Sequence, residues 1–203
     1  GASMSMNMTF THANGDVDVE LYGACGGAVA LSRTANTNNE VFTYTNATGS
    51  STILMRVFLG ADTRNNYTFS YTITTPPPAN DDCVSATPVT PGAYAFDTTG
   101  ATTSTPTVAA SCTDGAGTAI NKDVWFRYVP ECNGTATIST CGAAAFDTRI
   151  VVYQGTLGCP TAATAVFACN DDSAGCGSLT SSVSFETTDA QQYWVRIGSK
   201  ANV

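Results

Sequence analysis

The segment Phe146-Asp147-Thr148-Arg149-Ile150-Val151-Val152-Tyr153-Gln154-Gly155 decides how the chain is interpreted, because a similar segment occurs earlier. The earlier copy reads Gly15-Asp16-Val17-Asp18-Val19-Glu20-Leu21-Tyr22-Gly23. Each copy has an aspartate after a turn of small residues, continues as a β-rich run, and ends in tyrosine and glycine. Internal similarity of this kind is the signature of a repeated architecture. The two copies therefore predict two related domains.

Around both copies, apolar and polar residues alternate with the period of a half-buried strand. In the first half, strands are expected at 4–10, 16–22, 28–31, 40–45, 52–59 and 67–73. In the second half, they are expected at 94–98, 123–129, 134–140, 148–153, 165–168, 181–185 and 192–197. No segment longer than a turn shows helical periodicity. The predicted fold class is all-β, with two tandem jelly-roll or immunoglobulin-like β-sandwich domains.

The run Thr74-Thr75-Pro76-Pro77-Pro78-Ala79 separates the two halves. Three successive prolines cannot donate to a sheet ladder and favour a stiff, extended spacer. A surface loop is the alternative, but cysteine density also changes here, with one cysteine before the prolines and seven after them. We therefore predict a domain at 1–74, a proline-rich linker at 75–79 and a cysteine-rich domain at 80–203.

The composition is poor in charge and acidic in balance. Charged residues make up 12% of the chain, the formal net charge is −8 and the sequence pI is about 4.3. Because proteins bind nucleic acid mainly by neutralising phosphates with lysine and arginine, nucleic-acid binding is not expected. No apolar run approaches the roughly 20 residues of a membrane span, so we expect no membrane span.

Eight cysteines are best interpreted as disulfide partners. They are Cys25, Cys83, Cys112, Cys132, Cys141, Cys159, Cys169 and Cys176. Zinc is the alternative, but the chain has no C-x-x-C motif and a single histidine. The short spacings Cys132/Cys141, Cys159/Cys169 and Cys169/Cys176 suit bridges across hairpins or loops, although the pairing stays open. Disulfides predict an extracellular or cell-surface location, and a start at Gly1 without methionine suits a mature or partial sequence.

Each half lacks one strand that the other half contains. The run 54–57 aligns with 194–197, but only the first half continues into a further strand, 66–73. Only the second half has a strand at 123–130 ahead of its repeated core. We therefore expect the first domain to lack an N-terminal strand and the second to lack a C-terminal one.

The motifs of both halves resemble one known family. D-V-D-V-E-L-Y-G, L-M-R-V and N-Y-T-F-S-Y-T-I in the first half resemble the bacterial pre-peptidase C-terminal domain. N-D-D-C, D-V-W-F-R-Y, F-D-T-R-I-V-V-Y and Y-W-V-R-I-G in the second half resemble its cysteine-rich variant in multidomain bacterial surface proteins. The resemblance implies a non-catalytic, extracellular β-sandwich that in some members binds calcium, collagen or polysaccharide, and it fixes no ligand.

Acidic clusters make calcium the only cofactor to consider, and none is required by the sequence. Asn80-Asp81-Asp82 and Asn170-Asp171-Asp172, together with Asp147, supply hard oxygen ligands. Asn-Asp-Asp is also ordinary turn chemistry, because these side chains bond their own backbone. Asp16, Asp18 and Glu20 alternate along one strand face, for which a solvated face is expected rather than a second site.

Catalytic motifs are missing from the sequence, so no enzyme is predicted. His12 lies in a turn signal, and neither G-x-S-x-G nor H-E-x-x-H occurs. Four aromatic residues could form a sugar-stacking platform, but their strand patterns favour core packing. They are Trp125, Tyr153, Tyr193 and Trp194.

Sequons at Asn7, Asn46, Asn66 and Asn133 make N-glycosylation possible, and the Thr- and Ser-rich surface would suit O-linked sugar. The function predicted is a structural repeat unit of a surface fibre, filament or matrix. Neighbouring domains of a longer chain, or identical subunits joined head-to-tail, would complete each other by strand addition. The alternative is a carbohydrate- or protein-binding accessory module of a secreted hydrolase, with glycans as partners.

Overall fold

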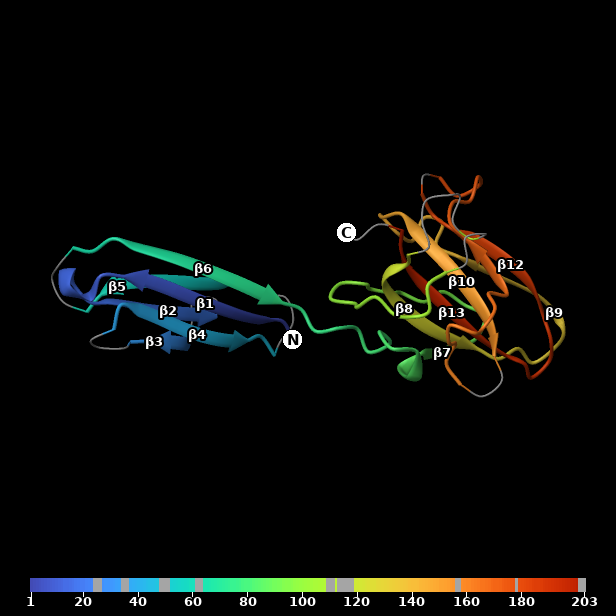
Figure 1. The fold of residues 1–203 in the computed structure, drawn as a ribbon, viewed down its shortest axis with the longest axis horizontal. Coiled ribbons are helices and arrows are strands. Elements are labelled where there is room, and N and C mark those ends of the chain that lie inside the picture. The colour runs from blue at the N-terminus through green and yellow to red at the C-terminus, as the bar shows by residue number, and fades with distance from the viewer. Residues whose placement is uncertain are drawn as a thin grey trace. The chain divides into compact units, whose positions relative to one another are not determined.

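The computed structural model describes residues 1–23, 27–33, 37–47, 52–60, 64–108, 112, 119–155, 158–177 and 179–200, and these residues form an all-β protein (Figure 1). The strands are β1 (Ser3–Phe10), β2 (Val17–Gly23), β3 (Ala28–Ser32), β4 (Asn39–Thr45), β5 (Ile53–Leu59), β6 (Tyr67–Thr74), β7 (Thr87–Val89), β8 (Asn121–Tyr128), β9 (Gly134–Ser139), β10 (Thr148–Gly155), β11 (Ala168–Asn170), β12 (Ser182–Thr187) and β13 (Gln192–Ser199). Single turns of 3-10 helix, η1 (His12–Asn14) and η2 (Cys83–Ser85), accompany them. In the described residues, no helix is long and apolar enough to cross a membrane.

The chain divides into two compact units, Gly1–Pro76 and Pro77–Val203. The division falls between two of the three prolines in the expected linker. Each unit is considered by itself below.

The first unit consists of two antiparallel sheets with the strand orders β4-β1-β6 and β3-β2-β5. Alternation in β1 places its apolar residues toward β2, as expected for a strand with one buried face. The core contains the buried side chains Met6, Met8, Phe10, Val17, Val19 and Leu21. Strands β3 and β4 lie in contact, so the two sheets meet along this edge.

The second unit has a five-stranded sheet of order β11-β10-β13-β8-β7 and a two-stranded sheet, β12-β9. All pairs are antiparallel except β7 with β8. One face of the larger sheet packs on the smaller sheet through buried residues such as Val124, Ile150 and Val195. The other face is covered by loops and carries a second core with Trp125, Tyr153 and Trp194.

Three disulfides join the covering loops and ends of the second unit: Cys83–Cys159, Cys112–Cys169 and Cys141–Cys176. They link positions 76, 57 and 35 residues apart. None of the closely spaced pairs suggested by the sequence is a bridge, because Cys141, Cys159, Cys169 and Cys176 each pair with a cysteine further away in the sequence. Cys132 is exposed and forms no disulfide with any other described cysteine, and Cys25 lies outside the described residues.

Two expected strands are wrong. Residues 94–98 form no strand; the hydroxyl of Tyr94 instead accepts a hydrogen bond from the amide of Thr90 at 3.0 Å, which holds this segment in a local loop. The expected strand at 165–168 lies too early, since β11 begins at Ala168, where pairing with β10 becomes possible. The remaining predicted strands occur within a few residues of their expected ends.

Candidate assembly edges and acidic clusters

The two units share one strand plan, which their sheet orders reveal. The order β3-β2-β5 of the first unit corresponds to β11-β10-β13 of the second, and β4-β1 corresponds to β12-β9. In both units, the contact between the sheets is on the same side, through β3 with β4 and through β11 with β12. The units differ on the opposite side. Strand β8 lies beside β13 in the second unit, whereas β6 lies beside β1 in the first.

The first unit therefore has an empty place beside β5, where the second unit has β8. Among the described residues, β5 pairs with β2 alone. Strand β6 belongs to the opposite sheet, and its apolar residues share the inner face with the buried side chains of β1. These residues nevertheless remain exposed, at 45% for Tyr67, 44% for Phe69, 60% for Tyr71 and 59% for Ile73. Exposed apolar residues gathered on one face are typical of a surface where another element packs.

Residues on the inner side of β5 are exposed in the same way. Met55 and Leu59 pair with the buried residues Leu21 and Val17 of β2, yet they keep 37% and 39% of their surface accessible. Together with the four exposed residues of β6, they form an apolar strip along the open side of the first unit, which we call the β5/β6 edge. An unpaired sheet edge with apolar neighbours is a site for strand addition.

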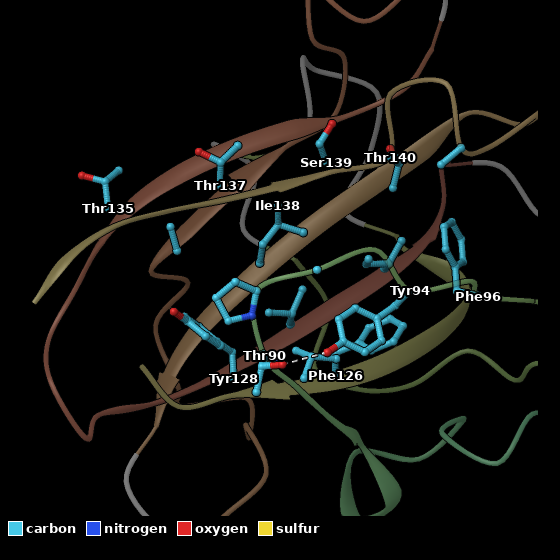
Figure 2. A pocket seen from close by; sticks show the side chains of 17 residues that line it. Thr90, Tyr94, Phe96, Phe126, Tyr128, Thr135, Thr137, Ile138, Ser139 and Thr140 are labelled. Atoms are coloured by element: carbon cyan, nitrogen blue, oxygen red, sulfur yellow. Dashed lines mark hydrogen bonds between the residues drawn. The ribbon is translucent and has the colours of Figure 1, made fainter. Parts of the chain in front are cut away.

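The second unit has its empty place beside β9, where the first unit has β6. Among the described residues, β9 pairs with β12 alone. A pocket of about 340 Å³ follows the other side of β9, and the inner faces of β8 and β13 form its floor. Figure 2 shows Ile138 directed into this pocket, with Phe126 and Tyr128 across from it, whereas Thr135 and Thr137 point away. We call this cavity the β9 slot.

A loop partly covers the β9 slot from the side of β7. Residues Val89 to Gly92, Tyr94 and Phe96 line the pocket there (Figure 2). Thr90 donates to the Tyr94 hydroxyl and keeps the pKa of Tyr94 below its ordinary value of 10.0. The loop thus supplies some of the apolar cover that β6 supplies in the first unit.

The acidic residues predicted to bind calcium in the second unit fall into two groups. Asp147, Asp171 and Asp172 have carboxylate oxygens within 4.8 Å of one another, and Asp81 and Asp82 do not join them. Asp81 is buried and accepts hydrogen bonds from the amide and hydroxyl of Thr102, at 2.6 and 2.8 Å. Asp81 therefore ties its loop to a segment 21 residues further along the chain, rather than bonding its own backbone in a local turn.

Protein cations already occupy part of the Asp147 cluster. Asp171 forms a buried ion pair with Arg149 at 2.8 Å, and the ammonium of Lys200 lies 3.1 Å from Asp171 and 3.3 Å from Asp172. Burial raises the pKa of Asp147, an effect that Lys200 opposes and Asp172 reinforces. Two cations against three carboxylates leave little net charge for a divalent ion.

The expected solvated face of Asp16, Asp18 and Glu20 is wrong. Asp18 and Glu20 are 8% and 2% exposed. Glu20 is held by ion pairs with Arg33 and Arg56. The carboxylates of Asp16 and Asp18 instead converge with that of Glu40, a residue of β4. Sequence reasoning missed Glu40 because no local spacing connects it with β2.

The remaining candidate residues have clear positions. The four aromatic residues considered for sugar stacking are buried in the two cores of the second unit, as the core-packing prediction stated. His12 lies in η1 with its Nδ1 3.3 Å from Asp16.

Of the sequon asparagines, Asn7, Asn66 and Asn133 are exposed and Asn46 is half-buried. Asn7 points to the outer face of the sheet β4-β1-β6, among the outward residues of the neighbouring strands, Val41 and Ser70. The residues of β1 that point to this outer face carry no charge. They are Ser3, Ser5, Asn7 and Thr9.

Comparison of the chain with models of known protein families gives no match, and comparison with curated protein sequences gives none either.

Proposed function

We propose that this chain is a non-catalytic, extracellular structural protein that assembles by β-strand addition at the β5/β6 edge and the β9 slot. The observation that carries the proposal is the reciprocal strand plan. Each unit has an empty place at the position where the other unit has a strand. A strand that fits either place would complete a sheet and cover apolar residues that now face solvent.

The chemistry of the two places supports strand binding rather than a chemical reaction. Both are formed by strand edges and apolar side chains, and no cluster of nucleophile, base and acid lies in them in the described part of the chain. Main-chain bonding at an edge supplies affinity, and pockets for alternate side chains supply selectivity. The resemblance to a family of secreted bacterial β-sandwich domains agrees with this role.

The partner could be a neighbouring domain of a longer chain or an identical subunit. Because the two places differ, a contact between identical subunits would be heterologous and would propagate a filament. Disulfides in the second unit suit an oxidising environment.

Electron microscopy and gel filtration with light scattering, applied to the purified full chain, test the proposal. Regular filaments or a concentration-dependent series of oligomers would support it. A monomer at every concentration, with β5 and β9 both protected from hydrogen exchange, would overturn it, because the edges would then be covered within one chain.

A peptide test addresses each empty place directly. The sequence of β6, YTFSYTIT, is the chain's own strand for the place beside β9, and the sequence of β8, NKDVWFRY, is its strand for the place beside β5. We expect added peptides of these sequences to bind the full chain and shorten its assemblies. Versions with serine at the inward apolar positions are the matched controls and should have no effect.

A ligand-binding accessory module is the second candidate, and the β9 slot is the observation that favours it. Its volume of about 340 Å³ and its aromatic residues Tyr94, Phe96, Phe126 and Tyr128 would suit a small apolar or sugar ligand. Calorimetry with oligosaccharides distinguishes the two functions, because a monomer that binds sugar in the slot would favour the module.

A further inference from the structure

The open side of β9 presents backbone groups that no strand in the described part of the chain uses. In an antiparallel ladder, residues that exchange backbone hydrogen bonds alternate with residues that do not. The amide of Thr140 donates to the carbonyl of Ser181 at 2.9 Å, where the register of β9 with β12 ends. Bonding toward β12 therefore falls on the even-numbered residues of β9. The N–H and C=O groups of the odd-numbered residues point to the open side, and these residues are Thr135, Thr137 and Ser139.

These backbone groups form one wall of the β9 slot. Thr135, Thr137 and Ser139 line the pocket, yet the side chains of Thr135 and Thr137 point away from it (Figure 2). They therefore contribute mainly backbone to the wall. A row of unpaired donors and acceptors beside a pocket indicates a main-chain occupant, because an added strand bonds to groups of this kind.

Strand β1, which corresponds to β9 in the first unit, has a partner on this side. The amide of Phe10 donates to the carbonyl of Asn38 at 3.0 Å, so the bonds of β1 toward β4 fall on its even-numbered residues. Its odd-numbered residues bond β6 instead, and their side chains point to the outer face. Strand β9 repeats this arrangement of backbone and side chains. We therefore expect the strand missing beside β9 to run antiparallel to it, as β6 runs antiparallel to β1.

The inner side of β9 determines which side chains can enter the slot. Ala136 and Ile138 are half-buried and line the pocket. Because the side chain of Ala136 is small, the space beside it is open to a larger one. In the first unit, the residues of β6 that lie across from inward residues of β1 include Phe69 and Tyr71. An added strand should likewise carry large apolar side chains at alternate positions.

Charge restricts the occupant further. None of the described residues that line the slot is charged, although the chain has a net charge of −8. A charged side chain placed in this apolar space would lose water without gaining a partner, which is costly. The slot therefore disfavours any strand with a charge at an inward position.

The open edge of β5 in another copy does not meet this requirement when it runs antiparallel to β9. The amide of Gly60 donates to the carbonyl of Asp16, so the free backbone groups of β5 belong to its odd-numbered residues. Pairing them with the free residues of β9 would turn Arg56 into the slot and leave Met55 and Leu59 outside it. A segment that is not part of a sheet has no such restriction.

Resting on the proposed strand addition, we infer that the partner of the β9 slot is an extended segment outside any folded sheet, bound antiparallel to β9. It has large apolar side chains at alternate positions and uncharged residues between them. Its outward residues exchange backbone hydrogen bonds with Thr135, Thr137 and Ser139, and its inward side chains fill the slot beside Ala136 and Ile138.

The sequence of β6, YTFSYTIT, is the probe because it has this alternation. A fluorescent peptide is titrated into the full chain at a concentration where light scattering finds monomers, and anisotropy gives the dissociation constant. N-methylation at the position of Ser70 removes a hydrogen bond to β9 and should weaken binding about tenfold. N-methylation at the position of Tyr71, whose amide would face away from β9, should change binding little.

Two variants of the chain test the same geometry from the other side. Ala136→Leu fills the inner side of the slot and should abolish peptide binding. Thr137→Leu adds the same side chain on the outer face and should preserve binding. Circular dichroism establishes that both variants are folded, and the methylated peptides test the unchanged chain independently of them.

The pattern of losses decides the outcome. No binding at millimolar peptide, or equal weakening by the two methylated peptides, would overturn the inference. Weakening only by methylation at the Tyr71 position would indicate a parallel strand and would overturn it too. Electron microscopy separates this inference from the proposed assembly. Filaments of a chain that ignores the peptide would contradict the inference alone, and a permanent monomer that binds the peptide in the expected pattern would contradict the assembly alone.

Discussion

Arg196 and Asp123 form an ion pair of 2.8 Å in which the two side chains are 1% and 0% exposed. The same guanidinium donates to the backbone carbonyls of Ser104, Pro106 and Ile120, and it lies 5.5 Å from the ring centroid of Trp125. It therefore connects the covering loop to the outer face of the five-stranded sheet. Arg149 and Asp171 repeat this arrangement on the neighbouring strand.

Removing the carboxylate of Asp123 should destabilise the second unit strongly. Asp123→Ala leaves the charge of Arg196 buried without its partner, a change that typically costs about 3–5 kcal/mol. Urea denaturation followed by tryptophan fluorescence measures it, because both tryptophans of the chain, Trp125 and Trp194, belong to this unit.

The control is an ion pair whose cation stays exposed. Arg56 is 60% exposed and its buried partner Glu20 keeps a second ion pair with Arg33, so Arg56→Ala should cost less than about 1 kcal/mol. Far-UV circular dichroism follows this denaturation, because both tryptophans belong to the second unit. Equal losses of unfolding free energy in Asp123→Ala and Arg56→Ala would contradict the view that the buried Arg196–Asp123 pair matters more for stability than an exposed arginine.

The disulfide Cys83–Cys159 closes the longest of the three loops, at 76 residues. Replacing both cysteines by serine should lower the stability of the second unit by about 4 kcal/mol, chiefly because the unfolded chain gains freedom. Urea denaturation without reductant measures the loss, and peptide mapping by mass spectrometry verifies the pairing. Recovery of a Cys159–Cys169 or Cys169–Cys176 peptide would contradict it.

Acid should stabilise the first unit. The pKa of Asp18 is raised by burial and by the neighbouring carboxylates, so the folded state takes up a proton more readily than the unfolded state. The free energy of unfolding therefore rises as pH falls through the raised pKa, and the gain is complete below the ordinary value of 3.8. Far-UV circular dichroism melts at about pH 7 and about pH 5 check this.

Asp18→Asn isolates the effect. At neutral pH, this variant should be at least as stable as the parent chain, because it removes the charge that the folded state disfavours. If Asp18→Asn keeps the full pH dependence of the first unit's stability, groups other than Asp18 cause that dependence.

Assembly should depend on one face of β6 and tolerate changes on the other. Tyr71 and Ile73 belong to the exposed apolar strip, whereas Thr72 points to the outer face between them. We expect Tyr71→Arg to reduce polymer mass at least tenfold by light scattering and Thr72→Arg to change it little. Equal effects of both variants would show that charge on the edge, rather than the apolar strip, controls assembly.

Much of the fold could be predicted from local sequence patterns. Alternation in 4–10 and the β-rich run at 148–153 predicted strands that occur, because side chains on a strand point to its two faces in turn. The strand predicted at residues 94–98 was wrong. Tyr94 and Phe96 have the spacing of a strand, but they serve as a loop cover for the β9 slot.

The partners of the acidic residues could not be predicted from their spacing, because those partners come from distant parts of the sequence. Asp171 was a candidate calcium ligand, and nothing in the sequence indicated that Arg149, 22 residues away, forms a buried ion pair with it. Glu40 reaches the Asp16 cluster from another sheet. The sign that could have indicated it is an isolated glutamate at an inward position of an apolar strand, where a charge needs a partner.

The proline segment between the two units has a consequence for how a growing assembly would end. Since each unit has one open place, a fragment containing only one unit could make one contact of the proposed assembly, whereas the whole chain could make two. Cleavage within 75–79 would therefore convert subunits into terminators, and a small fraction of cut chains would set the length of every polymer in the sample.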